Sequence, residues 1–574
     1  MKKKILLVLV AALSMSLLIG CNNKDKGIEG EESAIIPIER EDAVGNKVTR
    51  ISSQNPITFT STIEIIPDRV EESLEIDRQL QKELINGGYT LDNPLVIQNP
   101  FNISPLTALV LFETDEERTV RVTVKGNTEE TDIVTHADAH MTDLHRVSVV
   151  GLYPDKDNKV EIELIDEDDN VTDTKEIIIT TEPLPDSMDD MVEVEKYTEP
   201  SAFGLIVVSG FDTPYPIAFD TEGNIRWLLS ERYASYGYFP LSNGRFIVMA
   251  EDVLIPTYEK PHAQEMYEMD LIGRVHQIYY VKNGAHHEVI EKIPGGNLLI
   301  ASNSIDDHVE DVVVEMDRET GETIKYFDIR DVLGEAYVDM IDWAHINTVS
   351  YVEEDDSVVL SPRNIHSGVK INWSTDELMW ILGDPQFWEG TPYEDMVLQP
   401  ERDIVWHYQP HTIYQLEEDL DGNSDTIHVM MFDNHWHGTR KIDFFDDLPY
   451  SYVTIYDINE ETKTVSQSKL YEGIKSKVTS NYRFDSDAGR VFFMGGWLEH
   501  ETEDGKNGMI YEYDYETTEV LNQYSLKERF YRGYELIPDI NTTSFPMDEK
   551  DNYAKGVLRV ATLNKDSGGL PTVT

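Results

Sequence analysis

The stretch "VKINWSTDELMWILG", residues 369–383, decides the fold class of this 574-residue chain. It contains a strand-like run, a polar turn, and a second strand-like run that ends in large apolar residues. Runs of β-branched and aromatic residues separated by polar turns are typical of β-hairpins. Five further stretches share this pattern: 217–229, 267–281, 313–329, 453–471 and 510–526. The sequence therefore predicts six related hairpins between residue 200 and the C-terminus.

Short apolar strands lie between these hairpins. Clear examples are 243–250, 295–302, 355–364, 425–433 and 488–496, and "RGYELI" (532–537) is a sixth candidate. Hairpin repeats of this length indicate a β-propeller with four-stranded blades. We predict six blades over residues 200–574, with seven as the alternative. We expect "LRVATL" (558–563) to close the ring by pairing with "FGLIVVSG" (203–210), which would remove free strand edges.

Residues 56–195 form a separate region with strand-like runs divided by Asp, Asn, Gly and Pro. These runs are 108–115, 119–126, 145–154, 159–169 and 174–183, and a short helix is expected at 72–87. This pattern predicts a small antiparallel β-sandwich. The fold class is thus all-β, with an N-terminal sandwich, a linker at 183–200, and a six-bladed propeller.

The N-terminus carries a signal for export. Residues 1–20 combine a basic start with an apolar run of signal-peptide length, and this run ends at a cleavage-type site, "LIGC", so we expect no transmembrane helix in the mature protein. This resembles a bacterial lipoprotein signal, which implies cleavage before Cys21 and lipidation of its thiol. Residues 21–55 read as a flexible acidic tether. Because Cys21 is the only cysteine, no internal disulfide can form. We expect an exported, membrane-anchored lipoprotein.

The charge balance excludes one class of partner. The chain has 48 Lys and Arg against 108 Asp and Glu, a formal net charge of −60. Nucleic-acid binding needs a basic face, so no nucleic-acid partner is expected. Such a charge also repels anions at long range, so an anionic substrate would need local positive charge at its site.

Three consecutive units carry a histidine at a matching position before a turn and strand. They are the "HH" pair His286–His287, His345 in "DWAHIN" and His411 in "QPHTI", and Arg363 follows the strand "SVVLSP". In a propeller, such positions converge on a central channel. Imidazoles beside a guanidinium would make a cationic pocket that suits a tetrahedral oxyanion. A zinc or copper site is the alternative, although Arg363 would oppose metal binding.

These motifs, following an N-terminal β-domain, resemble the bacterial arylsulfate sulfotransferases over residues 60–570. The resemblance implies that His411 is a nucleophile that becomes sulfurylated, and that His345 and Arg363 hold the sulfuryl group. It also implies a site role for one histidine of the pair, for which we choose His287. Asn347 would share a strand face with His345 and is a candidate substrate-binding residue. Two departures are Glu288, where the family usually has Asp, and His435, where Gly commonly follows Asn.

The resemblance further implies ping-pong transfer from an aryl sulfate donor to a phenolic acceptor, without cofactor, metal or nucleotide. No Walker-type or dinucleotide motif is present in the sequence. Two alternatives stay open, a non-catalytic binding propeller and a metal-dependent hydrolase, and a homodimer is an open assembly state. The loop "DLDGNSD" (Asp419–Asp425) alternates oxygen-bearing residues, but its Gly is misplaced for an EF-hand, so we expect a solvated turn.

Overall fold

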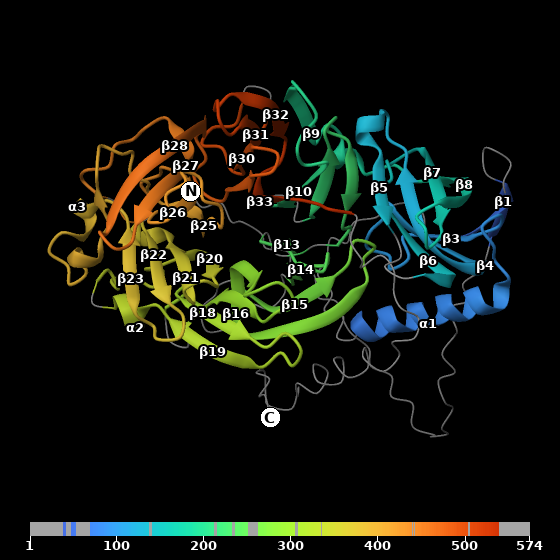
Figure 1. Ribbon diagram of the computed structural model, residues 1–574, viewed down its shortest axis with the longest axis horizontal. Coiled ribbons are helices and arrows are strands. Elements are labelled where there is room, and N and C mark those ends of the chain that lie inside the picture. Colours follow the sequence, from blue (N-terminus) through green and yellow to red (C-terminus); the bar gives the residue numbers. More distant parts are fainter. Residues whose placement is uncertain are drawn as a thin grey trace, which may run out of the picture. The chain divides into compact units, whose positions relative to one another are not determined.

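The computed structural model describes residues 38–41, 47–52, 69–136, 141–211, 215–231, 233, 236–250, 262–304, 308–334, 336–438, 440, 442–502 and 505–538. Within these residues the chain is mostly β (Figure 1). No helix among them is long and apolar enough to cross a membrane. The predicted signal peptide and Cys21 lie outside the described residues.

The N-terminal region is the expected β-sandwich, with one helix, α1 (Arg69–Gly87). Its strands are β1 (Ile38–Glu41), β2 (Lys47–Ser52), β3 (Leu95–Gln98), β4 (Thr107–Val124), β5 (Ile133–His136), β6 (Thr142–Val150), β7 (Asp157–Ile165) and β8 (Val171–Thr180). The long strand β4 belongs to both sheets, because it pairs with β3 and β6 at its start and with β5 and β7 at its end. It joins two runs that the sequence predicted as separate strands.

The predicted tether of residues 21–55 is too long. Strands β1 and β2 pair with each other, and β2 pairs with β3 in parallel, which also corrects the expectation of a purely antiparallel domain. The β-branched residues of "KVTRIS" favour an extended backbone, and pairing satisfies its peptide groups. The acidic composition that suggested a tether extends into this sheet.

Within the described part of the chain, the propeller has six blades of four or five strands. Blade 1 contains β10 (Leu205–Gly210), β11 (Ile217–Asp220), β12 (Ile225–Leu228) and β33 (Phe530–Glu535). Blade 2 contains β13 (Phe239–Pro240), β14 (Phe246–Met249), β15 (Ala263–Met269) and the first part of β16 (Val275–Glu291). Blade 3 contains the rest of β16 with β17 (Leu298–Ser302), β18 (Val312–Met316) and β19 (Thr323–Asp328). Because β16 runs through both, blades 2 and 3 form one continuous sheet.

The remaining blades follow in chain order. Blade 4 contains β20 (Ile346–Val352), β21 (Ser357–Pro362), β22 (Gly368–Asn372) and β23 (Leu378–Leu382). Blade 5 contains β24 (Gln399–Pro400), β25 (Pro410–Gln415), β26 (Ile427–Asp433), β27 (Tyr450–Asn459) and β28 (Thr464–Ile474). Blade 6 contains β9 (Val192–Lys196), β29 (Asn481–Asp485), β30 (Arg490–Gly495), β31 (Gly508–Asp514) and β32 (Val520–Leu526). Short helices α2 (Arg330–Leu333) and α3 (Pro385–Trp388) lie in connections around blade 4.

Two strands from the first and last parts of the propeller sequence close the ring. Strand β33, from the stretch "RGYELI", pairs with β10, and β9 pairs with β32 as an outer strand of blade 6. The prediction that residues 558–563 close the ring is wrong, because β11 and β33 already occupy both edges of β10. Residues 558–563 themselves lie outside the described residues. The predicted linker at 183–200 contains β9, so residues 192–196 belong to the propeller.

Neighbouring blades pack face to face through apolar side chains. One such cluster lies between blades 3 and 4 and contains the fully buried Trp343 and Trp388. Similar clusters lie between blades 2 and 3, 4 and 5, and 5 and 6. Each large apolar side chain buried in this way contributes about 1.5–3 kcal/mol. The blades thus form a rigid frame for residues at the ends of their inner strands.

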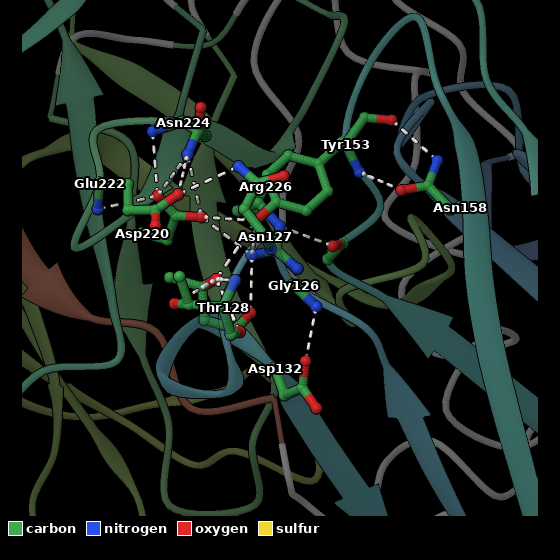
Figure 2. Close-up of polar contacts among 12 residues, drawn as sticks. Gly126, Asn127, Thr128, Asp132, Tyr153, Asn158, Asp220, Glu222, Asn224 and Arg226 are labelled. Carbon is green, nitrogen blue, oxygen red and sulfur yellow. Dashed lines mark hydrogen bonds and ion pairs between the residues drawn. The ribbon is translucent and has the colours of Figure 1, made fainter.

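A buried arginine ties blade 1 to the N-terminal sandwich (Figure 2). Arg226 of β12 is fully buried and donates to the carbonyl oxygens of Gly151 and Thr131 at 2.8 and 2.9 Å. It pairs with Asp220 at 2.9 Å, and its guanidinium lies 3.8 Å above the ring of Tyr153. A charge buried without water needs such partners, so these contacts fix the two domains together.

Candidate active site

Three consecutive blades bring the predicted site residues together. His287 lies in β16, His345 directly precedes β20, Arg363 directly follows β21, and His411 is the second residue of β25. Because β20 and β21 form a hairpin, its two ends meet, and the Arg363 amide donates to the carbonyl oxygen of His345 at 3.1 Å. The rings of His287 and His345 have centroids 4.8 Å apart.

Two hydrogen bonds determine the tautomer of His411. Asn434 donates through its side-chain nitrogen to the carbonyl oxygen of Ser476 at 2.8 Å, which directs its side-chain oxygen to His411 Nδ1. The Thr479 amide, which can only donate, lies 2.9 Å from His411 Nε2. Nδ1 therefore carries the proton and Nε2 carries the lone pair. Burial, followed by the charge of Arg363, holds the pKa of His411 well below its usual value, so the ring is neutral.

His345 has the opposite protonation state. Its Nδ1 lies 2.9 Å from Asp342 and also pairs with Glu310. Burial by itself lowers the pKa of His345, but the two carboxylates outweigh it and raise the pKa to about 9. His345 is an imidazolium at neutral pH. Its Nδ1 is held by the carboxylates, so Nε2–H is the donor left for a substrate.

His287 lies beside this cation and is neutral. The Tyr531 hydroxyl donates to its Nδ1 at 3.0 Å, and its Nε2 lies 3.4 Å from Glu310. Burial lowers the pKa of His287 to about 4, although Glu310 opposes the shift. The adjacent His286 is fully buried and donates to the carbonyl oxygen of Ser302 at 2.8 Å. This geometry favours His287 over His286 as the site residue.

Arg363 supplies a cation without a carboxylate partner. Among the described residues, no Asp or Glu forms an ion pair with its guanidinium, and its Nε is buried without a hydrogen-bond partner. Burial lowers the pKa of Arg363, but a guanidinium remains protonated in a protein. An unpaired buried cation is costly unless an anion binds to it. The charges of Asp342 and Glu310 act on Arg363 without forming an ion pair with it, so its guanidinium can still bind an anionic group.

Asn347 lies against the residue that precedes His411. Its side chain is fully buried, and its nitrogen lies 3.5 Å from the carbonyl oxygen of Pro410. A β-bulge between Ile346 and Val349 interrupts the strand alternation on which the predicted shared face depends. The structure thus places Asn347 against the segment that carries His411.

Glu288, which follows His287, makes a buried ion pair under the site. It lies 2.7 Å from Arg532 of β33 and accepts a hydrogen bond from Tyr414 at 3.1 Å. Arg532 also donates to the carbonyl oxygen of Asn347 at 2.6 Å. These contacts join strands of blades 1, 3, 4 and 5. Glu288, where the resembled family usually has Asp, therefore has a structural role.

Glu310 is a further site residue that was not predicted from the sequence. It is 5% exposed, with a backbone φ of 59°, and its carboxylate contacts His262 at 3.0 Å, His287 at 3.4 Å and His345. Its pKa is well below the usual value although burial opposes this, because His345 and His287 stabilise the carboxylate. A loop between β17 and β18 carries it, outside the repeated histidine position. No periodic signal in the sequence marks it.

The ligand atoms of His287, Glu310 and His345 lie within 4.8 Å of one another, as in a metal site. A protonated His345 cannot act as a ligand through Nδ1, and the unpaired cation Arg363 would repel a metal ion. The arrangement instead places one neutral nucleophilic nitrogen beside two cationic donors. This is the chemistry of a site that transfers an anionic, tetrahedral group.

The fold and the site together define a β-propeller whose buried histidines and arginine suit an anionic, tetrahedral group. The family model "Arylsulfotransferase (ASST)" matches residues 191–534, and "Arylsulfotransferase Ig-like domain" matches residues 95–182. The chain belongs to the arylsulfotransferase family and is an aryl sulfotransferase enzyme.

Two curated relatives share this match. The arylsulfate sulfotransferase AssT of Escherichia coli O6:H1 (strain CFT073) is 25% identical over 540 residues, which cover 74% of this chain and 88% of the relative. AssT of Lelliottia amnigena is 22% identical over 541 residues with the same coverage. Among solved structures, the WD40 domain of Toxoplasma gondii coronin aligns with 60% of this chain and 75% of that chain, at a TM-score of 0.31 and 8% identity.

Proposed function

We propose that this chain moves a sulfuryl group from an aryl sulfate to a phenol through a sulfohistidine at His411, without a nucleotide sulfate donor. The observation that carries the proposal is the tautomer of His411. Asn434 accepts from Nδ1–H, and the Thr479 amide donates to Nε2, so a neutral nitrogen lone pair is available for attack. The neighbouring cations match a sulfate ester, which is an anion.

In the first half-reaction, His411 Nε2 attacks sulfur and the Thr479 amide releases the lone pair. The bond between sulfur and the aryl oxygen breaks, and its electron pair leaves on that oxygen. Arg363 binds the non-bridging oxygens, whose negative charge it neutralises. His345 gives its Nε2 proton to the departing oxygen, so a neutral phenol leaves.

In the second half-reaction, an acceptor phenol gives its proton to the now neutral His345. Its oxygen attacks sulfur, the nitrogen–sulfur bond breaks, and the electron pair returns to His411 Nε2. Both steps leave the enzyme unchanged overall and need no oxidant or metal. They make the reaction ping-pong, because the first product leaves before the acceptor binds.

His345 fits the role of acid and base better than His287. Its pKa of about 9 is close to the value of about 10 for a phenol, and proton transfer is most effective when the two values are similar. His287 is neutral, with a pKa of about 4, and its Nε2 faces Glu310. We assign His287 to binding and to holding Glu310 in place.

The activity is tested with 4-nitrophenyl sulfate and phenol in the absence of any nucleotide. His411→Asn should reduce nitrophenol release by about 10³-fold or more, because no nitrogen nucleophile remains. His500→Asn, which changes an exposed histidine, is the matched control and should keep wild-type activity. Unchanged release by His411→Asn would rule out the proposed nucleophile.

We also propose that the enzyme is exported and held at a membrane by a lipid on Cys21. The support is the "LIGC" sequence at the end of the apolar N-terminal run. Cys21→Ser should move the protein from the membrane fraction to the soluble fraction. Retention of Cys21→Ser with the membranes would contradict a lipid anchor.

A further inference from the structure

The turn between β25 and β26 carries a second cluster of potential ligand atoms. Asp419 and Asp421 lie in this turn, and His428 is the second residue of β26. Their ligand atoms all lie within 4.8 Å of one another. His428 Nε2 lies 3.9 Å from an Asp419 carboxylate oxygen and 3.7 Å from an Asp421 carboxylate oxygen.

His428 is held with its ring directed at the two carboxylates. Its Nδ1 lies 2.9 Å from Asp457, which also accepts a hydrogen bond from Ser468 at 2.9 Å. The other ring nitrogen, Nε2, is buried without a hydrogen-bond partner, and the His428 side chain is only 2% exposed. A histidine that donates one N–H to a carboxylate and directs its other nitrogen outward is typical of metal ligands.

We propose that Asp419, Asp421 and His428 bind a divalent transition metal ion of the zinc class. The imidazole ligand argues against Ca²⁺ and Mg²⁺, which prefer all-oxygen sites. Two carboxylates neutralise the ion, and their side chains are 55% and 39% exposed, so water can complete the coordination. Ligand atoms about 2.1 Å from one zinc ion lie roughly 3.4 Å apart in a tetrahedron, so only small side-chain rotations are needed.

A simple ion pair accounts for this geometry less well. A charged imidazolium hydrogen bond to a carboxylate is typically about 2.7–2.9 Å long. The distances of 3.7 and 3.9 Å from His428 Nε2 to the two carboxylates are too long for such bonds. One nitrogen also faces both carboxylates, whereas a single N–H would bond to one of them. The spacing suits an atom located between the three groups. The loop "DLDGNSD" is then a ligand-bearing turn of a different kind from an EF-hand.

The bound ion would stabilise blade 5. It would connect the β25–β26 turn to His428 in β26 and, through Asp457, to β27. His411 lies at the opposite end of β25 from this turn. The site is therefore structural, and its expected effect is higher thermal stability rather than a part in the chemistry.

Zinc binding by the whole chain tests this site. After treatment with EDTA and dialysis, the protein is titrated with Zn²⁺, and bound metal is measured by elemental analysis and calorimetry. Asp421→Asn and His428→Gln should each bind one zinc ion fewer per chain than the wild type. Asp425→Asn and His500→Gln change an exposed acid of the same turn and an exposed histidine, and both should bind as the wild type does. Asp421 is partly exposed, so its variant should fold even if His428→Gln does not.

Thermal melting gives a second readout. Zn²⁺ should raise the Tm of the wild type and of Asp425→Asn by roughly 2–4 °C, and should leave the Tm of Asp421→Asn unchanged. Equal zinc stoichiometry in Asp421→Asn and Asp425→Asn would overturn the proposal. Preferential binding of Ca²⁺ over Zn²⁺ at this position would overturn the assignment to a transition metal.

Discussion

The neighbouring residues His345 and His287 differ in charge because the Glu310 carboxylate lies closer to His345 than to His287. Glu310 lies close to Nδ1 of His345, which Asp342 also contacts, whereas its contact with His287 is longer. The two carboxylates raise the pKa of His345 to about 9, and burial lowers the pKa of His287 to about 4. The Glu310 carboxylate thus helps to keep His345 protonated, while the neighbouring His287 stays neutral.

Replacing Glu310 by Gln should shift the pH dependence of transfer. Because its folded pKa is raised, His345 is protonated below about pH 9, and steps that need its proton slow as the pH rises through that value. Without the Glu310 charge this alkaline loss should begin at lower pH. The measurement is kcat against pH for a phenyl sulfate and for 4-nitrophenyl sulfate, whose better leaving group needs less acid assistance.

An unchanged alkaline limb in Glu310→Gln would contradict the acid role of His345. Glu353→Gln, an exposed acid in the β20–β21 turn, is the control and should have the wild-type profile.

The sequence indicated four of these site residues and missed others for a clear reason. His287, His345 and His411 were predicted from matching positions in consecutive units, Arg363 from its place directly after a strand, and their roles from the resemblance to the arylsulfate sulfotransferases. Glu310 and Asn434 lie in connections between strands, where nothing repeats. Their positions depend on loop conformations, such as the positive φ of Glu310, that are fixed only by tertiary contacts.

At the scale of the strands, the inner strands are joined by a buried ion pair. Glu288 in β16 and Arg532 in β33 are 2% and 1% exposed, and Arg532 also bonds to backbone oxygens in blades 4 and 5. Removal of one partner of a buried pair leaves the other charge without compensation.

Glu288→Ala should therefore lower the free energy of unfolding by about 3–5 kcal/mol. Arg78→Ala is a suitable control, because it removes ion pairs on α1 whose side chains are more than half exposed, and it should cost about 0–1 kcal/mol. Denaturant unfolding measures both. Similar losses in the two variants would show that the pair does not stabilise the inner strands.

Most strands could be predicted from local sequence patterns, whereas the strand pairing that closes the propeller ring could not. The six hairpins of the propeller all occur, because alternation and turn residues are local properties. The pairing of β33 with β10 and of β9 with β32 joins segments more than 300 residues apart. Both "RGYELI" and "LRVATL" are apolar enough to pair with the free edge of β10. The sequence alone therefore does not decide between them.

At the scale of the whole molecule, Arg226 connects the sandwich to the propeller. Arg226→Met should weaken this connection, because Asp220 loses its buried partner and two carbonyl oxygens lose their donor. We expect a loss of about 3–5 kcal/mol and a lower Tm in calorimetry. Arg121→Met, within the sandwich and partly exposed, is the control and should change the Tm little. Equal Tm values for Arg226→Met and the wild type would contradict this role.

The net charge of −60 should affect the two substrates differently. An aryl sulfate is an anion and is repelled at long range, so salt that screens the protein should favour its binding. KM for the aryl sulfate should fall between about 10 and 150 mM ionic strength, over which the Debye length decreases from about 30 to 8 Å. KM for a neutral phenol should stay constant. Parallel changes for both substrates would contradict this electrostatic account.

If His411 carries the sulfuryl group between the two substrates, the modified histidine can be detected directly. The most direct measurement is peptide mass spectrometry after treatment with 4-nitrophenyl sulfate and no acceptor, under alkaline conditions that preserve sulfohistidine. We expect one added sulfuryl group, located on His411 and lost when phenol is supplied. A turning-over enzyme without a modified His411 peptide, or with the group on another residue, would contradict it.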